Sequence, residues 1–123
     1  MIVLLVSMLG GLGAATRFMF DGWMRGRWST GLPVATIVIN VSGSLLIGFL
    51  ARGLAAGGIT PNGYVVAATG FCGGYTTFST ATVETVRLAQ AGAYRRAVMN
   101  ALGTLVLTVL AAAGGVAIAG LVF

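Results

Sequence analysis

The stretch GFCGGYTTFSTAT, from Gly70 to Thr82, interrupts an otherwise apolar segment of membrane length with glycines and hydroxyl side chains. A lipid bilayer tolerates free backbone carbonyl and amide groups only where protein or water satisfies them. A helix that is broken at mid-membrane depth therefore normally lines a binding site or a pathway. The sequence predicts such a break at Gly73 and Gly74, and this is where we expect the function to lie.

The composition around this stretch is that of a membrane protein. Of the 123 residues, 58% are hydrophobic and only 7% are charged, which leaves too little polar surface for a soluble domain. The length allows about four spans of ~20 residues. No segment alternates in the manner of a barrel strand. We therefore expect an all-α integral membrane protein, a single domain over residues 1–123, whose third transmembrane helix is broken.

Loop signals between the apolar segments place the four spans. Asp21 to Leu32, with Trp23 and Trp28, is typical of an interfacial loop with aromatic anchors. Arg17, near the far end of the first span, can reach the interface by snorkelling. The predicted spans are residues 1–20, 33–51, 64–87 and 97–123.

Small residues recur at four-residue spacing inside the predicted spans. This spacing lets helices approach closely. We expect most of these pairs to pack within the bundle and some to serve a dimer interface. The pairs are Gly10 with Ala14, Ser44 with Gly48, and Ala111 with Gly115.

Polar residues inside the spans form two further tracks beside the break. Asn40 and Ser44 share one face of the second helix, and Asn100, Thr104 and Thr108 form a ladder on the fourth. Alternatively, the threonines bond to the carbonyls four residues before them and the asparagines join helices. Three tracks in so short a chain favour a polar conduit, because each such group is costly in hydrocarbon.

The donors along this conduit suit a small anion. They are amides and hydroxyls, with no chain of carboxylates among them. The edge of the Phe78 ring could add to them, since it carries positive charge, although plain packing is the alternative. Glu84 has three interpretations: a proton-linked group, a residue at the pore mouth, or a partner of Arg87 one turn on.

The net charge of +5 does not indicate nucleic-acid binding. It comes from seven arginines that stand singly or in pairs beside apolar segments, not in a patch. Six of them lie in or beside the first and third loops, and only Arg52 lies on the other side. Because positive residues in short loops prefer the cytoplasm, this bias predicts external termini and insertion mostly in one direction.

Three stretches together resemble the Fluc/CrcB family of fluoride channels. They are GGLGAATR (Gly10 to Arg17), PVATIVINVSGSLLIG (Pro33 to Gly48) and above all TGFCGGYTTFSTATVE (Thr69 to Glu84). The resemblance implies an antiparallel, dual-topology dimer of four-helix subunits with two fluoride pores in the cell membrane of a bacterium or archaeon. Conduction would be passive and would drain cytoplasmic fluoride, and no reaction would be catalysed.

The resemblance also assigns roles to particular residues. The backbone carbonyls of Gly73 and Thr76 would hold a structural sodium ion at the dimer centre. Apart from the resemblance, we expect Arg17 and Glu84 to be accessory or mouth residues. With Ser44, which shares the face of Asn40, the residues expected along the anion path are Asn40, Phe78, Ser79, Thr80, Asn100, Thr104 and Thr108.

One position departs from the family pattern. The family usually has TTFSTF where this chain has TTFSTA, so Ala81 stands in place of a second pore phenylalanine. A homodimer would lack one ring in both pores, whereas a heterodimer with a paralogous subunit would keep one pore intact. Ala81 therefore leaves one alternative open, a non-conducting or half-active partner subunit of a heterodimeric channel. A separate alternative is a small proton-coupled multidrug transporter, which would need a carboxylate at the centre of the first span, where this chain has none.

Overall fold

The structure, a computed structural model, describes residues 1–28 and 32–123, and every regular element in them is a helix. Three helices are long and apolar enough to cross a membrane: α1 (Ile2–Arg27), α2 (Val34–Ala55) and α6 (Tyr94–Ala119). The remaining segment, the third in chain order, is broken into α3 (Pro61–Tyr64), the π-helical stretch η1 (Val65–Cys72), α4 (Gly73–Tyr75) and α5 (Ser79–Gln90). The predicted all-helical class, with a broken third segment, is confirmed.

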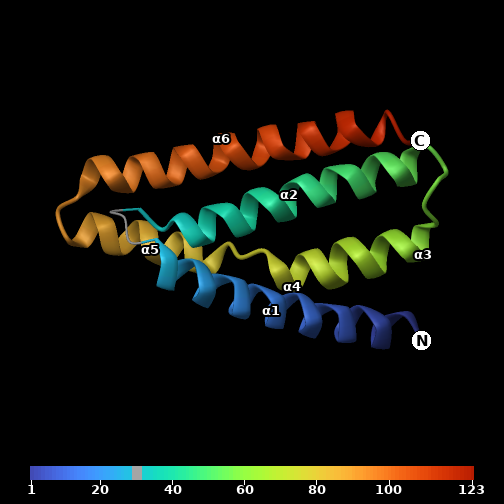
Figure 1. The fold of residues 1–123 in the computed structure, drawn as a ribbon, viewed down its shortest axis with the longest axis horizontal. Coiled ribbons are helices and arrows are strands. Elements are labelled where there is room, and N and C mark those ends of the chain that lie inside the picture. Colours follow the sequence, from blue (N-terminus) through green and yellow to red (C-terminus); the bar gives the residue numbers. More distant parts are fainter. Residues whose placement is uncertain (29–31) are drawn as a thin grey trace.

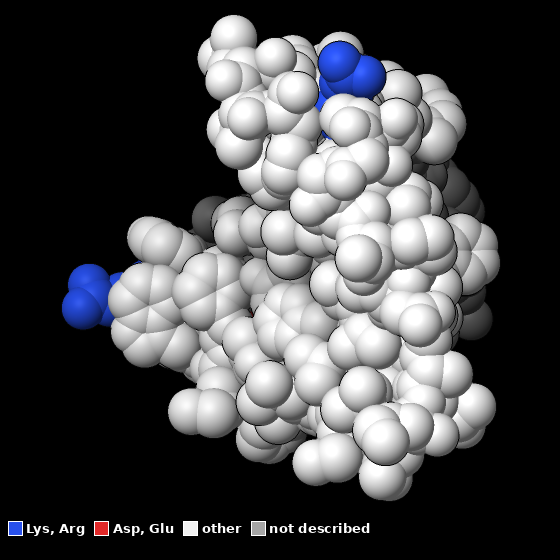
Figure 2. All heavy atoms as spheres, turned by 90° about the vertical axis from the view of Figure 1, so that its right-hand side faces the viewer, with Lys and Arg blue, Asp and Glu red and all other residues white. Residues whose placement is uncertain are grey.

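The helices lie along a common long axis, with both termini at one end (Figure 1). Helix α6 packs along α2, while α1 packs against η1 and α4. The short α5 lies beside α6 at the opposite end from the termini. Figure 2, which faces the end with the termini, shows a mainly uncharged surface with a few basic side chains and no acidic one in view.

Glycines make the close helix contacts possible. A Cβ at Gly48 would overlap the carbonyl oxygen of Ala112, and one at Gly115 would overlap that of Leu45. A Cβ at Gly74 would likewise overlap the carbonyl oxygen of Gly10. The packing within the bundle that the small-residue spacing predicts is therefore confirmed at Gly10, Gly48 and Gly115.

Large apolar side chains mainly face outward. The buried cluster is small and consists of Met24, Ala35, Ile39 and Tyr75. Phe18, by contrast, is 81% exposed on α1. Such a distribution suits a lipid environment, where apolar side chains have no drive to leave the solvent.

The predicted boundaries of all four spans differ from those of the helices. Helix α1 continues to Arg27, so Asp21 to Arg27 is not a loop, and an ion pair between Asp21 and Arg25 supports the added turn. Gly22 and Gly26, which suggest a loop in the sequence, are simply tolerated in this helix. Helix α2 likewise passes Arg52 and ends at Ala55. Residues 29–31 of the predicted loop lie outside the described residues.

The predicted position of the break is also wrong. Gly73 and Gly74 are helical, and the chain leaves the helix at Thr76, where ψ is 161°. Gly74 serves the contact with α1 instead of the break. The break therefore follows the glycines by two residues, where side chains can bind the freed backbone groups.

Adjacent glycines in α6 allow a matched test of the packing. Gly115→Ala should lower the free energy of unfolding by about 1–3 kcal/mol, because its methyl group would meet the backbone of α2. Gly114→Ala is the control, since a Cβ there meets nothing within 4 Å in the subunit. Chemical unfolding in mild detergent measures both variants, and equal stability of the two would contradict the contact.

Candidate functional site

Asn40 binds both backbone groups of Thr77 in the break. Its Nδ2 donates to the Thr77 carbonyl at 2.8 Å, and its Oδ1 accepts from the Thr77 amide at 2.8 Å. Asn40 is buried and lies in the second turn of α2, facing the break. One side chain thus replaces the helical hydrogen bonds that the break removes.

Thr77 in turn begins the second half of the broken helix. Its Oγ1 accepts from the Thr80 amide at 3.1 Å, as the side chain of an N-cap residue does. Its hydroxyl also donates to Thr80 Oγ1 at 3.1 Å. Ser79 Oγ lies 3.4 Å from the same hydroxyl. The break therefore contains its own capping group for α5.

Because of these contacts, two backbone carbonyl groups lose the amide donors that a regular helix would give them. In an uninterrupted α-helix the Thr77 amide would donate to the Gly73 carbonyl, and the Thr80 amide to that of Thr76. Both amides are bound by side chains instead. The carbonyls of Gly73 and Thr76 are consequently left available to another partner.

Arg17 binds at the break, whereas the sequence predicts that its side chain extends to the interface. Its Nε donates to the Gly74 carbonyl at 3.2 Å. The positive charge lies at the carboxyl end of the first half-helix, where the helix dipole favours it. Arg17 therefore stabilises the break.

A cavity of about 530 Å³ lies between α2, α5 and α6, directly beside the break. It brings together six of the eight residues predicted along the anion path. They are Asn40, Ser44, Phe78, Asn100, Thr104 and Thr108. Ala81 also lines the cavity, so the substituted position faces the same space as Phe78.

The other two predicted path residues lie elsewhere. Ser79 is exposed, and Thr80 lines a second cavity of about 250 Å³ together with Arg17 and Asp21. Both belong to the first turn of α5, whose opposite sides face the two cavities.

The polar track on α6 is mixed in character. The Thr108 hydroxyl donates to the Thr104 carbonyl at 2.8 Å, as the alternative interpretation of back-bonding threonines expects. Asn100 Nδ2 donates to Thr85 Oγ1 at 2.7 Å and thereby joins α6 to α5. The Thr104 hydroxyl and Asn100 Oδ1 are buried and have no partner in the described part of the chain. Thr104 thus keeps a free donor at the cavity.

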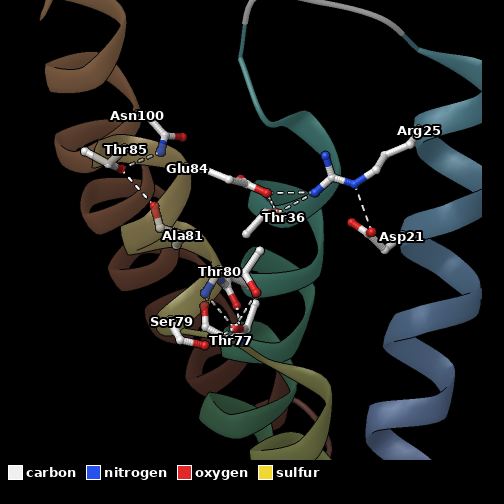
Figure 3. Close-up of polar contacts among 11 residues, drawn as sticks. Asp21, Arg25, Thr36, Thr77, Ser79, Thr80, Ala81, Glu84, Thr85 and Asn100 are labelled. Carbon is white, nitrogen blue, oxygen red and sulfur yellow. Dashed lines mark hydrogen bonds and ion pairs between the residues drawn. The ribbon is translucent and has the colours of Figure 1, made fainter. Parts of the chain in front are cut away.

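One interpretation of the sequence pairs Glu84 with Arg87, but in the structure Glu84 pairs with Arg25 instead. Its Oε1 lies 2.7 Å from Nη2 of Arg25 and accepts from the Thr36 hydroxyl at 3.0 Å (Figure 3). Arg25 also binds Asp21 through Nε at 2.8 Å. The network joins α1, α2 and α5 at the end of the bundle away from the termini.

The sequence predictions missed Thr77, Thr85 and Arg25. The position of Thr77, three residues before Thr80, fits an N-cap and could have indicated its role. The spacing from Asp21 could have paired Arg25 within α1. The contacts of Arg25 with Glu84, and of Thr85 with Asn100, cross between helices and leave no local signal.

Comparisons with known proteins agree across nearly the whole chain. The family described as "CrcB-like protein, Camphor Resistance (CrcB)" matches residues 4–116. A fluoride-specific ion channel FluC 1 of Leifsonia xyli subsp. xyli is 45% identical over 98% of this chain and 88% of its own length. A FluC 2 channel of Cutibacterium acnes is 44% identical over 96% and 97%, and a FluC channel of Thermus thermophilus is 36% identical over 95% and 92%. This chain belongs to the CrcB family.

Proposed function

We propose that the chain is a subunit of a fluoride-selective channel that lets cytoplasmic fluoride leave the cell passively. The observation that carries the proposal is the cavity between α2, α5 and α6, whose polar lining consists of amide and hydroxyl groups without a carboxylate. Fluoride is small and strongly hydrated. A selective path must therefore replace its water with N–H and O–H donors in a narrow passage.

Donors remain available at this cavity. The Thr104 hydroxyl is buried without a partner among the described residues, and Asn40 uses only one of its two N–H groups on the Thr77 carbonyl. Phe78, 87% exposed in the single chain, lines the same cavity and can turn its positive ring edge toward an anion. These groups supply the hydration shell that the ion would lose.

The relatives support the same activity, because they carry the name of fluoride-specific ion channels and match over nearly their full length. The multidrug transporter is not favoured, since α1 carries no carboxylate before Asp21. The chain is a multi-pass membrane protein. We place it in the cell membrane of a bacterium or archaeon.

The exposure of Phe78 favours completion of the pore by a second subunit. A large ring that is left open beside the cavity needs a protein surface to narrow the passage. An antiparallel dimer, either of two copies or with a paralogous subunit, would supply that surface. In a dimer of two copies, Ala81 would leave the cavity wider than a phenylalanine would.

A structural sodium ion fits the residues of the break. Sodium takes oxygen ligands, and the carbonyls of Gly73 and Thr76 have lost their regular helical donors to Asn40 and Thr77. Half-helix ends with unwound carbonyls are typical cation sites in membrane proteins. Bound there, the ion would satisfy the broken backbone without being transported.

Reconstitution of the purified protein in liposomes tests the function. With a potassium fluoride gradient and a potassium ionophore, a fluoride electrode outside should record rapid efflux, because the cavity offers anion donors. Matched liposomes loaded with potassium chloride should show far slower efflux of chloride than the first liposomes show of fluoride. Fluoride efflux no faster than from protein-free liposomes would contradict the proposal.

Asn40→Asp should reduce fluoride efflux to the level of protein-free liposomes. The substitution removes the donor to the Thr77 carbonyl and places a negative charge where an anion must pass. Asn62→Asp is the control, because it adds the same charge at an exposed position of α3. Size-exclusion chromatography checks that both variants assemble, and normal efflux through Asn40→Asp would place Asn40 off the pathway.

Charge asymmetry favours insertion mostly in one direction, with the termini outside. Arg17 is bound inside the bundle, but five arginines remain at or beside the end with the α1–α2 and α5–α6 connections, against Arg52 toward the other end. Reporter fusions at Phe123, scored for external and cytoplasmic activity, should give a mainly external signal. Nearly equal signals would indicate dual topology and favour a homodimer.

A further inference from the structure

One arginine binds every acidic side chain of this protein. The sequence contains two acidic residues, Asp21 and Glu84. Arg25 contacts Asp21 Oδ2 through Nε at 2.8 Å and Glu84 Oε1 through Nη2 at 2.7 Å. Its guanidinium therefore pairs with both acidic side chains of the chain.

Glu84 depends on this compensation more than Asp21 does. Its side chain is only 14% exposed, against 31% for Asp21. Its Oε2 is buried without a partner in the described part of the chain, and the Thr36 hydroxyl binds only Oε1. A carboxylate in this position would become an uncompensated, largely buried charge if Arg25 were removed.

The charge lies next to the proposed anion path. Thr85, the next residue along α5, lines the cavity and binds Asn100. Figure 3 shows Thr85 beside Asn100, whereas the carboxylate of Glu84 extends to Thr36 and Arg25 on the other side. The direction of the Glu84 side chain is thus set by partners on α1 and α2.

We propose that Arg25 is a positioning residue for conduction: it neutralises Glu84 and holds the carboxylate on the α1 side, away from the cavity. A free carboxylate beside Thr85 would repel an anion across a short distance in a medium of low dielectric constant. Arg25 therefore keeps an electrostatic barrier from forming at the cavity. This inference rests on the proposed fluoride channel function.

Two arginines on the same turn of α1 allow a matched test. Arg25→Gln should lower fluoride efflux from liposomes about tenfold. A rise of about 1.4 kcal/mol in the free-energy barrier to fluoride passage is enough for this change. Arg27→Gln, which loses the same charge, should stay close to the unmodified protein. Arg27 lies over the Trp23 ring at 5.3 Å and makes no ion pair within the described residues. Equal efflux through the two variants would overturn the inference.

A double variant separates neutralisation from a purely structural role. If Arg25 acts by compensating Glu84, the Arg25→Gln/Glu84→Gln protein should recover most of the lost efflux, because the unpaired charge is gone. Arg25→Lys should also conduct, because it keeps the positive charge. If the network only fastened the helices, the double variant would conduct no better than Arg25→Gln, and that result would overturn the inference.

The same double variant decides the case in which Arg25→Gln fails to assemble. Efflux through an assembled double variant close to that of the unmodified protein supports neutralisation, and its absence contradicts it. Lack of efflux through the unmodified protein would overturn both the channel function and this inference. Normal efflux there, combined with an unaffected Arg25→Gln, would overturn only the role of Arg25.

Discussion

The paired hydrogen bonds between Asn40 and Thr77 are the constraint on which the site depends. A break inside a membrane segment leaves backbone groups that lipid cannot bind, and each would be costly if left alone. Asn40 resolves this for Thr77 with one amide and one carbonyl oxygen at 2.8 Å each. The position of Asn40 on α2 therefore fixes where the third segment can be broken.

The two hydrogen bonds between Asn40 and Thr77 affect the structure on both sides of the break. Toward α4, Asn40 binds the Thr77 amide, which would otherwise donate to the Gly73 carbonyl. Thr77 Oγ1 likewise binds the Thr80 amide, which would otherwise donate to the Thr76 carbonyl. Toward α6, the same pair of hydrogen bonds opens the segment beside Ser44, Phe78 and Thr104, so that a cavity forms there. A cation site and an anion path can thus both arise from a single local interruption.

The sequence was sufficient for the helical class, for the presence of a broken segment and for six of the eight predicted path residues, because each rests on local pattern. Four-residue spacing placed Asn40 with Ser44 and Asn100 with Thr104, and the structure brings these to one cavity. The break was misplaced because Gly73 and Gly74 suggest flexibility, whereas they are helical and Gly74 serves contact with α1. Contacts between helices, such as Arg25 with Glu84, depend on tertiary packing and are invisible to spacing.

Charge completes the picture, because the chain carries seven basic and two acidic side chains. Arg17 binds the Gly74 carbonyl at the break, and Arg25 forms ion pairs with both carboxylates. Basic side chains outnumber acidic ones, so the net charge is +5, and its summed field attracts anions toward the mouths of a pathway. The donors inside the cavity are neutral, so they can bind an anion without trapping it. Attraction at the ends and neutral donors between them are the two conditions that anion conduction requires.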